Sequence, residues 1–382
     1  MVLNDVYINR IGTFFPNDPV SNDEMESILG MVDNRPSRAR KLISESSGIK
    51  CRYYAIDKRT GKRTHSNAQM TAEAIRKLTG KDFTLEAIEC LVCGTSSPDQ
   101  FLPSHAVMVH GELKNPSCEV ASIAGICMSG LQALKYGYMS VLSSQTTNAV
   151  CTGSELASSI MRGNQFEGEI KSRITELKQK PILAFEKDFL RWMLSDGAGA
   201  VLLQSSPNSC GLSLKIEWVD IYSFANELPT CMYQGANKDG DKNIIGYRDY
   251  APEEWIANSV MAVKQDVKLL NKHMVSVAVK ALSMTLKKRD IDIGGIDYFL
   301  IHLSSEYFRK ELDEAYRESG NEIPQSKWFT NLASVGNVGS ASIYLMLEEL
   351  FHSGKLEKGF KLLLVVPESG RFTMSYALLT VV

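Results

Sequence analysis

The chain has 382 residues, of which 44% are hydrophobic and 23% are charged, and its formal net charge is −2. This length and composition suit a large folded core divided over two domains. The near-neutral charge gives no reason to expect a nucleic-acid or anionic-membrane partner.

The start of the chain and its cysteines predict a cytoplasmic protein. Residues 1–15 lack the basic start and apolar centre of a secretory signal. No apolar run approaches the ~20 residues that a membrane span needs. The 8 cysteines are scattered rather than arranged as a disulfide framework, which fits a reducing compartment.

The first half of the chain alternates predicted helices and buried strands. A helix is expected over residues 68–78, and residues 87–97 form a short apolar run with a polar exit. Such runs are typical of strands buried on both faces, as in a parallel sheet. Cys90 and Cys93 lie within this run. Because side chains three apart on a strand point to opposite faces, we interpret neither as a metal ligand or a redox partner.

Cys127 is the candidate nucleophile of this half. Apolar residues such as Leu131 and Leu134 recur behind it at helical spacing, so Cys127 is expected at a helix N-terminus. Unpaired N–H groups and the positive end of the helix dipole favour a thiolate there. A buried structural cysteine fits the local pattern equally well. A strand over residues 149–155 and an apolar run at 198–203 complete the half.

The second half begins with the same alternation. A helix is expected over residues 274–287 and a buried strand within residues 295–305. His302 occupies the exit of that strand, where open α/β sheets place functional groups. A single histidine at such a point is more often structural than catalytic, so the position alone does not assign it a role.

Asn337 lies in a loop of small residues that precedes a helix expected over residues 343–350. An asparagine there is also a common helix cap. A strand over residues 362–369 and an apolar run at 376–382 end the chain.

Four landmarks recur in the same order in both halves. Residues 87–97 resemble 295–305, 121–125 resemble 333–337, and 149–155 resemble 362–369. Each half also closes with an apolar run. This repetition predicts two α/β halves, residues 1–205 and 206–382, that join at the turn-rich segment 205–211. A pseudo-twofold arrangement of such halves would make Cys127, His302 and Asn337 neighbours, a thiolate facing two hydrogen-bond donors.

Taken together, these motifs resemble the thiolase superfamily, and within it the ketoacyl synthase III-like enzymes. The resemblance covers nearly the whole chain and rests on the order of its segments, which are residues 12–16, 47–52, 95–105, 196–201, 301–302 and 336–342.

The resemblance implies a duplicated five-layer αβαβα fold and a condensing activity. Cys127 would take an acyl group from a thioester, while His302 and Asn337 polarise the second thioester carbonyl during a Claisen condensation. It also implies a homodimer that needs no metal or other cofactor, because acyl-CoA or acyl carrier protein thioesters serve as substrates.

The chain departs from the family pattern at several points. Ser305 stands where the histidine motif normally continues to an asparagine, and it is expected to contact substrate. Residues 367–372 replace the usual glycine-rich loop, and residues 162–187 form an additional polar stretch. With these departures, the chain resembles ketosynthases that join an acyl group to a β-ketoacyl thioester and cyclise the product to a dialkylresorcinol precursor. Ring closure needs a further acid/base group, and Glu368 and Glu306 are the candidates.

Two alternatives stay open at this point. The Cys127-bound acyl group could be transferred to an alcohol or amine without forming a carbon–carbon bond. The chain could also be a non-catalytic partner that completes a ketosynthase heterodimer.

Overall fold

The computed structural model describes residues 3–32, 34–37, 40–166, 190–241 and 243–382. Most of the additional polar stretch predicted at residues 162–187 lies outside these ranges, from residue 167 onward.

One mixed sheet dominates the described part of the chain, with its strands in the order β14-β13-β15-β16-β8-β1-β7-β6-β4-β5. Its strands are β1 (Tyr7–Phe14), β4 (Cys90–Thr95), β5 (Glu119–Ala124), β6 (Asn148–Glu155), β7 (Gly197–Gln204), β8 (Leu214–Ser223), β13 (Tyr298–Ile301), β14 (Trp328–Phe329), β15 (Lys361–Glu368) and β16 (Thr373–Val381).

The strand pairing has the same order on both sides of the sheet. In the N-terminal group, β5, β4 and β6 are parallel, and β7 and β1 follow in antiparallel pairing. In the C-terminal group, β14, β13 and β15 are parallel, and β16 and β8 follow in antiparallel pairing. Within the sheet, the two groups are joined where Tyr7 of β1 pairs with Lys215 of β8 and Ile8 pairs with Leu214. The domain boundary at 205/206 stays a prediction, although segment 205–211 does connect β7 to β8.

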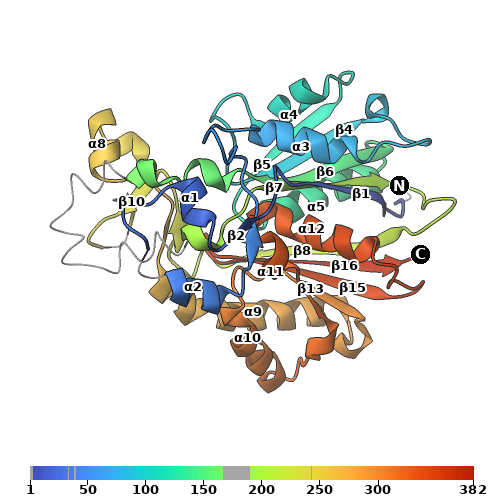
Figure 1. Cartoon of the computed structure of the whole chain (residues 1–382). Coiled ribbons are helices and arrows are strands. Elements are labelled where there is room, and N and C mark those ends of the chain that lie inside the picture. The colour runs from blue at the N-terminus through green and yellow to red at the C-terminus, as the bar shows by residue number, and fades with distance from the viewer. Residues whose placement is uncertain (1–2, 33, 38–39, 167–189, 242) are drawn as a thin grey trace.

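Helices cover the outer faces of the two strand groups and fill the space between them (Figure 1). α3 and α4 lie over the N-terminal strands, α9 and α10 over the C-terminal strands, and α5 and α12 lie between the groups. Their bounds are α3 (Asn67–Arg76), α4 (His105–Leu113), α5 (Ser129–Leu142), α9 (Val267–Arg289), α10 (Tyr307–Glu318) and α12 (Ser342–Phe351). The layers are therefore helix, strand, helix, strand, helix, which is the five-layer α/β architecture that the sequence predicts.

Alternate side chains along β15 face different layers of this architecture. Leu362 and Leu364 pack into the central layer with α5 and α12, whereas Leu363 and Val365 pack against the outer helices. β4 does the same, because Cys90 faces the central layer and Cys93 faces α3 and α4. The two cysteines point to opposite faces, as predicted from their spacing.

Smaller elements surround one end of the sheet (Figure 1). They are β2 (Val20–Ser21), β3 (Cys51–Arg52), α1 (Met25–Leu29), α2 (Arg40–Ser47), α11 (Leu332–Val335), β9 (Met232–Tyr233), β10 (Ala236–Lys238), β11 (Ile244–Gly246), β12 (Lys264–Gln265) and α8 (Pro252–Ala257). No helix in the described ranges has the length and apolar character to cross a bilayer.

One of the predicted landmark matches is wrong in detail. Residues 121–124 belong to the edge strand β5, whereas residues 333–335 belong to the short helix α11. The two segments share small residues because each precedes a tightly packed central helix, not because they share a backbone conformation.

Candidate active site

The carboxyl ends of the parallel strands in both groups carry the candidate residues. Cys127 follows β5, and Glu155 ends β6. His302 follows β13, Asn337 lies in the loop beyond β14, and Glu368 ends β15. Parallel strands bring such exits to one edge of a sheet, which is where open α/β sheets bind ligands.

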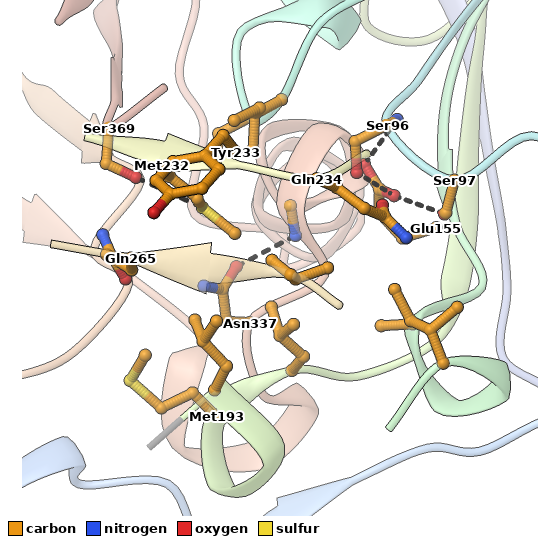
Figure 2. A pocket seen from close by; sticks show the side chains of 18 of the residues that line it. Ser96, Ser97, Glu155, Met193, Met232, Tyr233, Gln234, Gln265, Asn337 and Ser369 are labelled. Carbon is orange, nitrogen blue, oxygen red and sulfur yellow. Dashed lines mark hydrogen bonds between the residues drawn. The ribbon is translucent and has the colours of Figure 1, made fainter. Parts of the chain in front are cut away.

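A cavity of about 150 Å³ opens at this edge. Cys127 and Asn337 both line it, together with Glu155 and the turn at Ser96 and Ser97 (Figure 2). The rest of the described wall is mostly apolar and includes Ala157, Ile160, Leu190, Met193, Leu194, Met232 and Val263. The structure thus brings the predicted nucleophile and the predicted amide donor to one small, largely apolar space.

Cys127 is buried in the turn that leads into α5, two residues before the helix begins. This turn is tied down because the N–H and hydroxyl of Ser129 both donate to the carbonyl of Ile126. Gly130 follows, and a Cβ at that position would lie 2.1 Å from the carbonyl oxygen of Ser340. Glycine there lets the start of α5 pass close to the asparagine loop.

The expectation that Cys127 is a thiolate at rest is wrong. Burial raises the pKa of its thiol well above the usual value, and the nearby carboxylates of Glu368 and Glu155 raise it further. The dipole argument fails because Glu368 already takes the N–H groups at the head of α5. Its Oε2 accepts from the N–H of Ile126 at 3.0 Å, and the N–H of Met128 also donates to it.

The loop around Asn337 fixes the orientation of its side chain. The N–H of Gly339 donates to Oδ1 of Asn337 at 2.9 Å, and the backbone N–H of Asn337 donates to the carbonyl of Met193 at 2.9 Å. Since Oδ1 is occupied, the Nδ2 end of the amide is left for other partners.

His302 is buried, but it is not among the described residues that line the cavity, so the structure brings together only two of the three predicted catalytic residues there. Its backbone N–H donates to the carbonyl of Val365 at 2.9 Å, which extends the β13–β15 pairing by one residue. Its Nε2 is buried and finds no partner among the described residues. Burial lowers the pKa of His302 to about 4, so the ring is neutral at physiological pH.

Known proteins resemble the chain over nearly its whole length. Residues 286–379 match the family described as 3-oxoacyl-[acyl-carrier-protein (ACP)] synthase III C terminal. A β-ketoacyl-[acyl-carrier-protein] synthase III of Clostridium perfringens is 25% identical over 360 residues, covering 93% of each chain. The corresponding enzyme of Koribacter versatilis is 25% identical over 373 residues, covering 97% of this chain and 96% of its own.

The chain is similar to ketoacyl synthase III enzymes over nearly its whole length.

Several solved structures share the fold of this chain. AbyA1, described as a tetronic acid condensing enzyme, superposes with a TM-score of 0.75 at 19% identity over 98% of this chain and 99% of its own. OleA of Xanthomonas campestris superposes with a TM-score of 0.73 at 18% identity, over 100% and 98% of the two chains. The fold predicted from the sequence is therefore confirmed.

Two further predicted residues of this ketoacyl synthase III-like chain lie away from the cavity wall. Ser305 is fully buried, its hydroxyl donates to the carbonyl of Ser46 at 3.3 Å, and the N–H of Tyr307 donates to it at 3.2 Å. Glu306 pairs with Arg309 through two contacts, at 2.5 and 3.0 Å. Neither side chain is among the described residues that line the cavity, because both are engaged in the first turn of α10 and its contact with residues 46–48.

Glu155 is the site residue that the sequence patterns did not single out. Glu155 ends β6 in the same way that Glu368 ends β15. The predicted match between residues 149–155 and 362–369 therefore already pointed to the equivalence of these two glutamates. Burial raises the pKa of both carboxyl groups. No group of three or more His, Cys, Asp or Glu side chains in the described ranges is arranged to hold a metal ion.

Proposed function

We propose that the chain is a ketosynthase that joins a Cys127-bound acyl group to a second thioester by Claisen condensation. The observation that carries this proposal is the cavity at the carboxyl ends of the strands. There a buried cysteine and an oriented asparagine amide line the same wall, in a chain related to 3-oxoacyl synthases over nearly its full length.

The first half-reaction is acyl transfer to Cys127. The sulfur attacks the thioester carbonyl of the donor, the donor carbon–sulfur bond breaks, and the carrier thiol leaves. Because Cys127 starts as a thiol, a neighbouring base takes its proton during the attack and returns it to the departing carrier thiolate. Glu368 is the base we assign, since its carboxylate accepts the N–H groups that flank Cys127 and burial raises its pKa.

The second half-reaction forms the carbon–carbon bond. Glu368 accepts a proton from the α-carbon of the second thioester, and the carbanion attacks the acyl carbonyl on Cys127. The bond between that carbonyl and the sulfur then breaks, and Cys127 recovers the proton from Glu368. Asn337 Nδ2 and His302 Nε2 stabilise the oxygen of the second thioester as its negative charge develops.

The charges around the cavity favour a β-ketoacyl thioester over malonyl as the second substrate. The described residues that line the cavity include the carboxylate of Glu155 but no lysine, arginine or histidine, and Glu368 adds a second carboxyl group beside it. A malonyl carboxylate would find no counterion among the described residues of this space, and a like charge at short range is unfavourable. A β-ketoacyl thioester is neutral, and its α-proton is acidified by two carbonyl groups.

Three finer expectations remain part of this proposal. They are ring closure of the condensed product to a dialkyl cyclohexanedione, assembly as a homodimer, and delivery of the acyl groups by coenzyme A or acyl carrier protein. The tetronic acid condensing enzyme among the structural relatives is a precedent for a thiolase-fold condensing enzyme outside ordinary fatty acid synthesis. Mass and nuclear magnetic resonance analysis of the product decides whether a ring forms.

The test is product identification with acyl, malonyl and β-ketoacyl thioesters offered in pairs to the purified chain. We expect an acyl adduct on Cys127 by intact-protein and peptide mass spectrometry, then a condensed product that retains all carbons of the β-ketoacyl partner. Cys127→Ala is the control and should give neither. An adduct that is discharged only to alcohols or amines would favour the simple acyltransferase. Turnover that requires an added homologue would favour the partner-subunit alternative.

A further inference from the structure

The carboxylate of Glu155 joins the two strand groups at the cavity. Its Oε1 accepts two backbone N–H groups, from Ser96 and from Ser340, both at 3.2 Å. Its Oε2 accepts the hydroxyls of Ser96 and Ser97, both at 2.6 Å (Figure 2). Ser96 and Ser97 follow β4 in the N-terminal group, whereas Ser340 lies in the 3₁₀ turn that leads into α12 of the C-terminal group.

The residue that orients Asn337 packs directly on this carboxylate. Gly339 donates its N–H to Oδ1 of Asn337 at 2.9 Å, and it has a φ of +49°. A Cβ on Gly339 would lie 3.0 Å from the Glu155 side chain. The carboxylate therefore holds Ser340 by a hydrogen bond and supports Gly339 by contact, and these are the second and third residues after Asn337.

We propose that Glu155 is a positioning residue for the condensation step, which it serves by holding the loop that presents the Asn337 amide. This inference rests on the proposed function, because it concerns the amide that is assigned to the second substrate. It differs from an acid/base role, since Glu155 acts as a hydrogen-bond acceptor and no proton needs to leave or reach it.

The hydrogen-bond pattern predicts which substitution preserves that role. Glutamine keeps one oxygen, which can occupy the Oε1 position and accept both backbone N–H groups. Its amide nitrogen then occupies the Oε2 position and donates to the hydroxyls of Ser96 and Ser97, which can rotate to accept. Alanine removes the acceptor and leaves the buried N–H of Ser340 and the part-buried N–H of Ser96 unpaired, so the asparagine loop loses one of the contacts that hold it.

The experiment compares Glu155→Ala, Glu155→Gln and a control, Glu89→Ala, in the two half-reactions. Glu89 is also a carboxylate beside a strand of the same sheet, but it accepts from Thr147 at the opposite end of β4 and is exposed. Acylation is measured as the rate of adduct formation on Cys127, and condensation as discharge of preformed acyl-enzyme by the second thioester.

We expect Glu155→Ala to keep acylation within about threefold of the wild type and to lose roughly 10- to 100-fold in condensation. Glu155→Gln should restore condensation to within about threefold, and Glu89→Ala should match the wild type in both steps. Equal loss of both half-reactions in Glu155→Ala would overturn the proposal. So would a glutamine variant as inactive as the alanine variant, because that outcome indicates an acid/base role.

Crystal structures of the same variants test the inference without reference to activity. In Glu155→Ala the Asn337 Oδ1 should leave hydrogen-bond distance of the Gly339 N–H, and in Glu155→Gln it should stay. An asparagine loop that is unchanged in the alanine variant would overturn the positioning role even if the chain condenses thioesters. A wild-type chain that forms neither adduct nor product would instead contradict the proposed function, and the loop geometry would still decide the role of Glu155.

Discussion

Glu155 and Glu368 reach across the boundary between the two strand groups in opposite directions. Glu155 ends β6 in the N-terminal group and accepts the N–H of Ser340, just ahead of α12 in the C-terminal group. Glu368 ends β15 in the C-terminal group and accepts the N–H of Ile126, just ahead of α5 in the N-terminal group. Each central helix is thus anchored by a carboxylate from the other group, and both carboxylates lie near Cys127.

The first prediction concerns the reactivity of the Cys127 thiol. Burial, and after it two nearby carboxylates, raise its pKa, so alkylation by iodoacetamide should be slow at pH 7 and should accelerate as the pH rises above 8. Removing the charge of Glu368 lowers the pKa of Cys127, and Glu368→Gln should alkylate about tenfold faster at pH 8. Rates are measured by mass spectrometry of the peptide that contains Cys127.

Glu306→Gln is the control for that experiment. Glu306 is another glutamate of the C-terminal half, but it pairs with Arg309 and is not among the described residues that line the cavity. Its substitution should leave the alkylation rate of Cys127 unchanged. Rapid alkylation of Cys127 at pH 7 in the wild type would contradict the raised pKa and indicate that this cysteine is a thiolate at rest.

The second prediction separates the two half-reactions with His302→Ala. The ring is neutral and its Nε2 has no partner in the described part of the chain, so its proposed contribution is a hydrogen bond to the second substrate. Condensation should fall by about 10²- to 10³-fold, whereas acylation should fall less than about tenfold. Single-turnover assays of adduct formation and discharge give the two rates. Equal loss in both steps would be evidence against the assigned role.

The strands and central helices could be predicted from the sequence because their apolar patterns are regular. The helices expected at residues 68–78 and 343–350 correspond to α3 and α12, and the strand expected at residues 149–155 corresponds to β6. Long-range pairing was harder to foresee. β1 lies between strands that occur some 200 residues later, and nothing local in residues 7–14 specifies the partners β7 and β8.

The candidate site was predictable where a chemically distinctive residue stands just ahead of a predicted central helix. Cys127 and Asn337 were found in this way, and they line one cavity. His302 was found at the exit of a predicted strand, and it is not among the described residues that line this cavity. Glu155 was missed because a glutamate after a strand has the same local pattern whether it is solvated or anchors a loop 185 residues away. The ionisation state of Cys127 was mispredicted for a related reason. The carboxylate that takes the N–H groups ahead of α5 comes from residue 368, and no local pattern reveals it.

The third prediction tests the close approach of α5 to the asparagine loop. A Cβ at Gly130 would lie 2.1 Å from the carbonyl oxygen of Ser340 and 3.0 Å from the ring of Tyr344. Gly130→Ala should therefore destabilise the protein by about 1–3 kcal/mol, measured by urea unfolding.

Gly111→Ala is the matched control for this change. Gly111 lies inside α4, and a Cβ there would meet nothing within 4 Å. Since alanine is the better helix former, Gly111→Ala should stabilise by about 0.5–1 kcal/mol. If both variants shift the unfolding midpoint in the same direction, the contact between α5 and the loop is not tight.

The fourth prediction concerns pH and the stability contributed by buried His302. Burial lowers its pKa from 6.5 to about 4, so the folded state favours the neutral ring. The stability associated with this shift is fully present above pH 6.5, the value in the unfolded chain. It is lost as the pH falls toward 4, because the unfolded state binds the proton first, and the loss is roughly 3 kcal/mol.

Buried Glu155 and Glu368, whose pKa values are raised, act in the opposite direction, so the wild-type curve alone does not isolate His302. The difference in the free energy of unfolding between wild type and His302→Gln, measured in urea at intervals from pH 7 to pH 4.5, cancels the carboxylate contributions. That difference should shift in favour of the variant as the pH falls, because glutamine does not titrate. A difference that stays constant across this range would show that His302 has an ordinary pKa and is therefore solvated rather than buried.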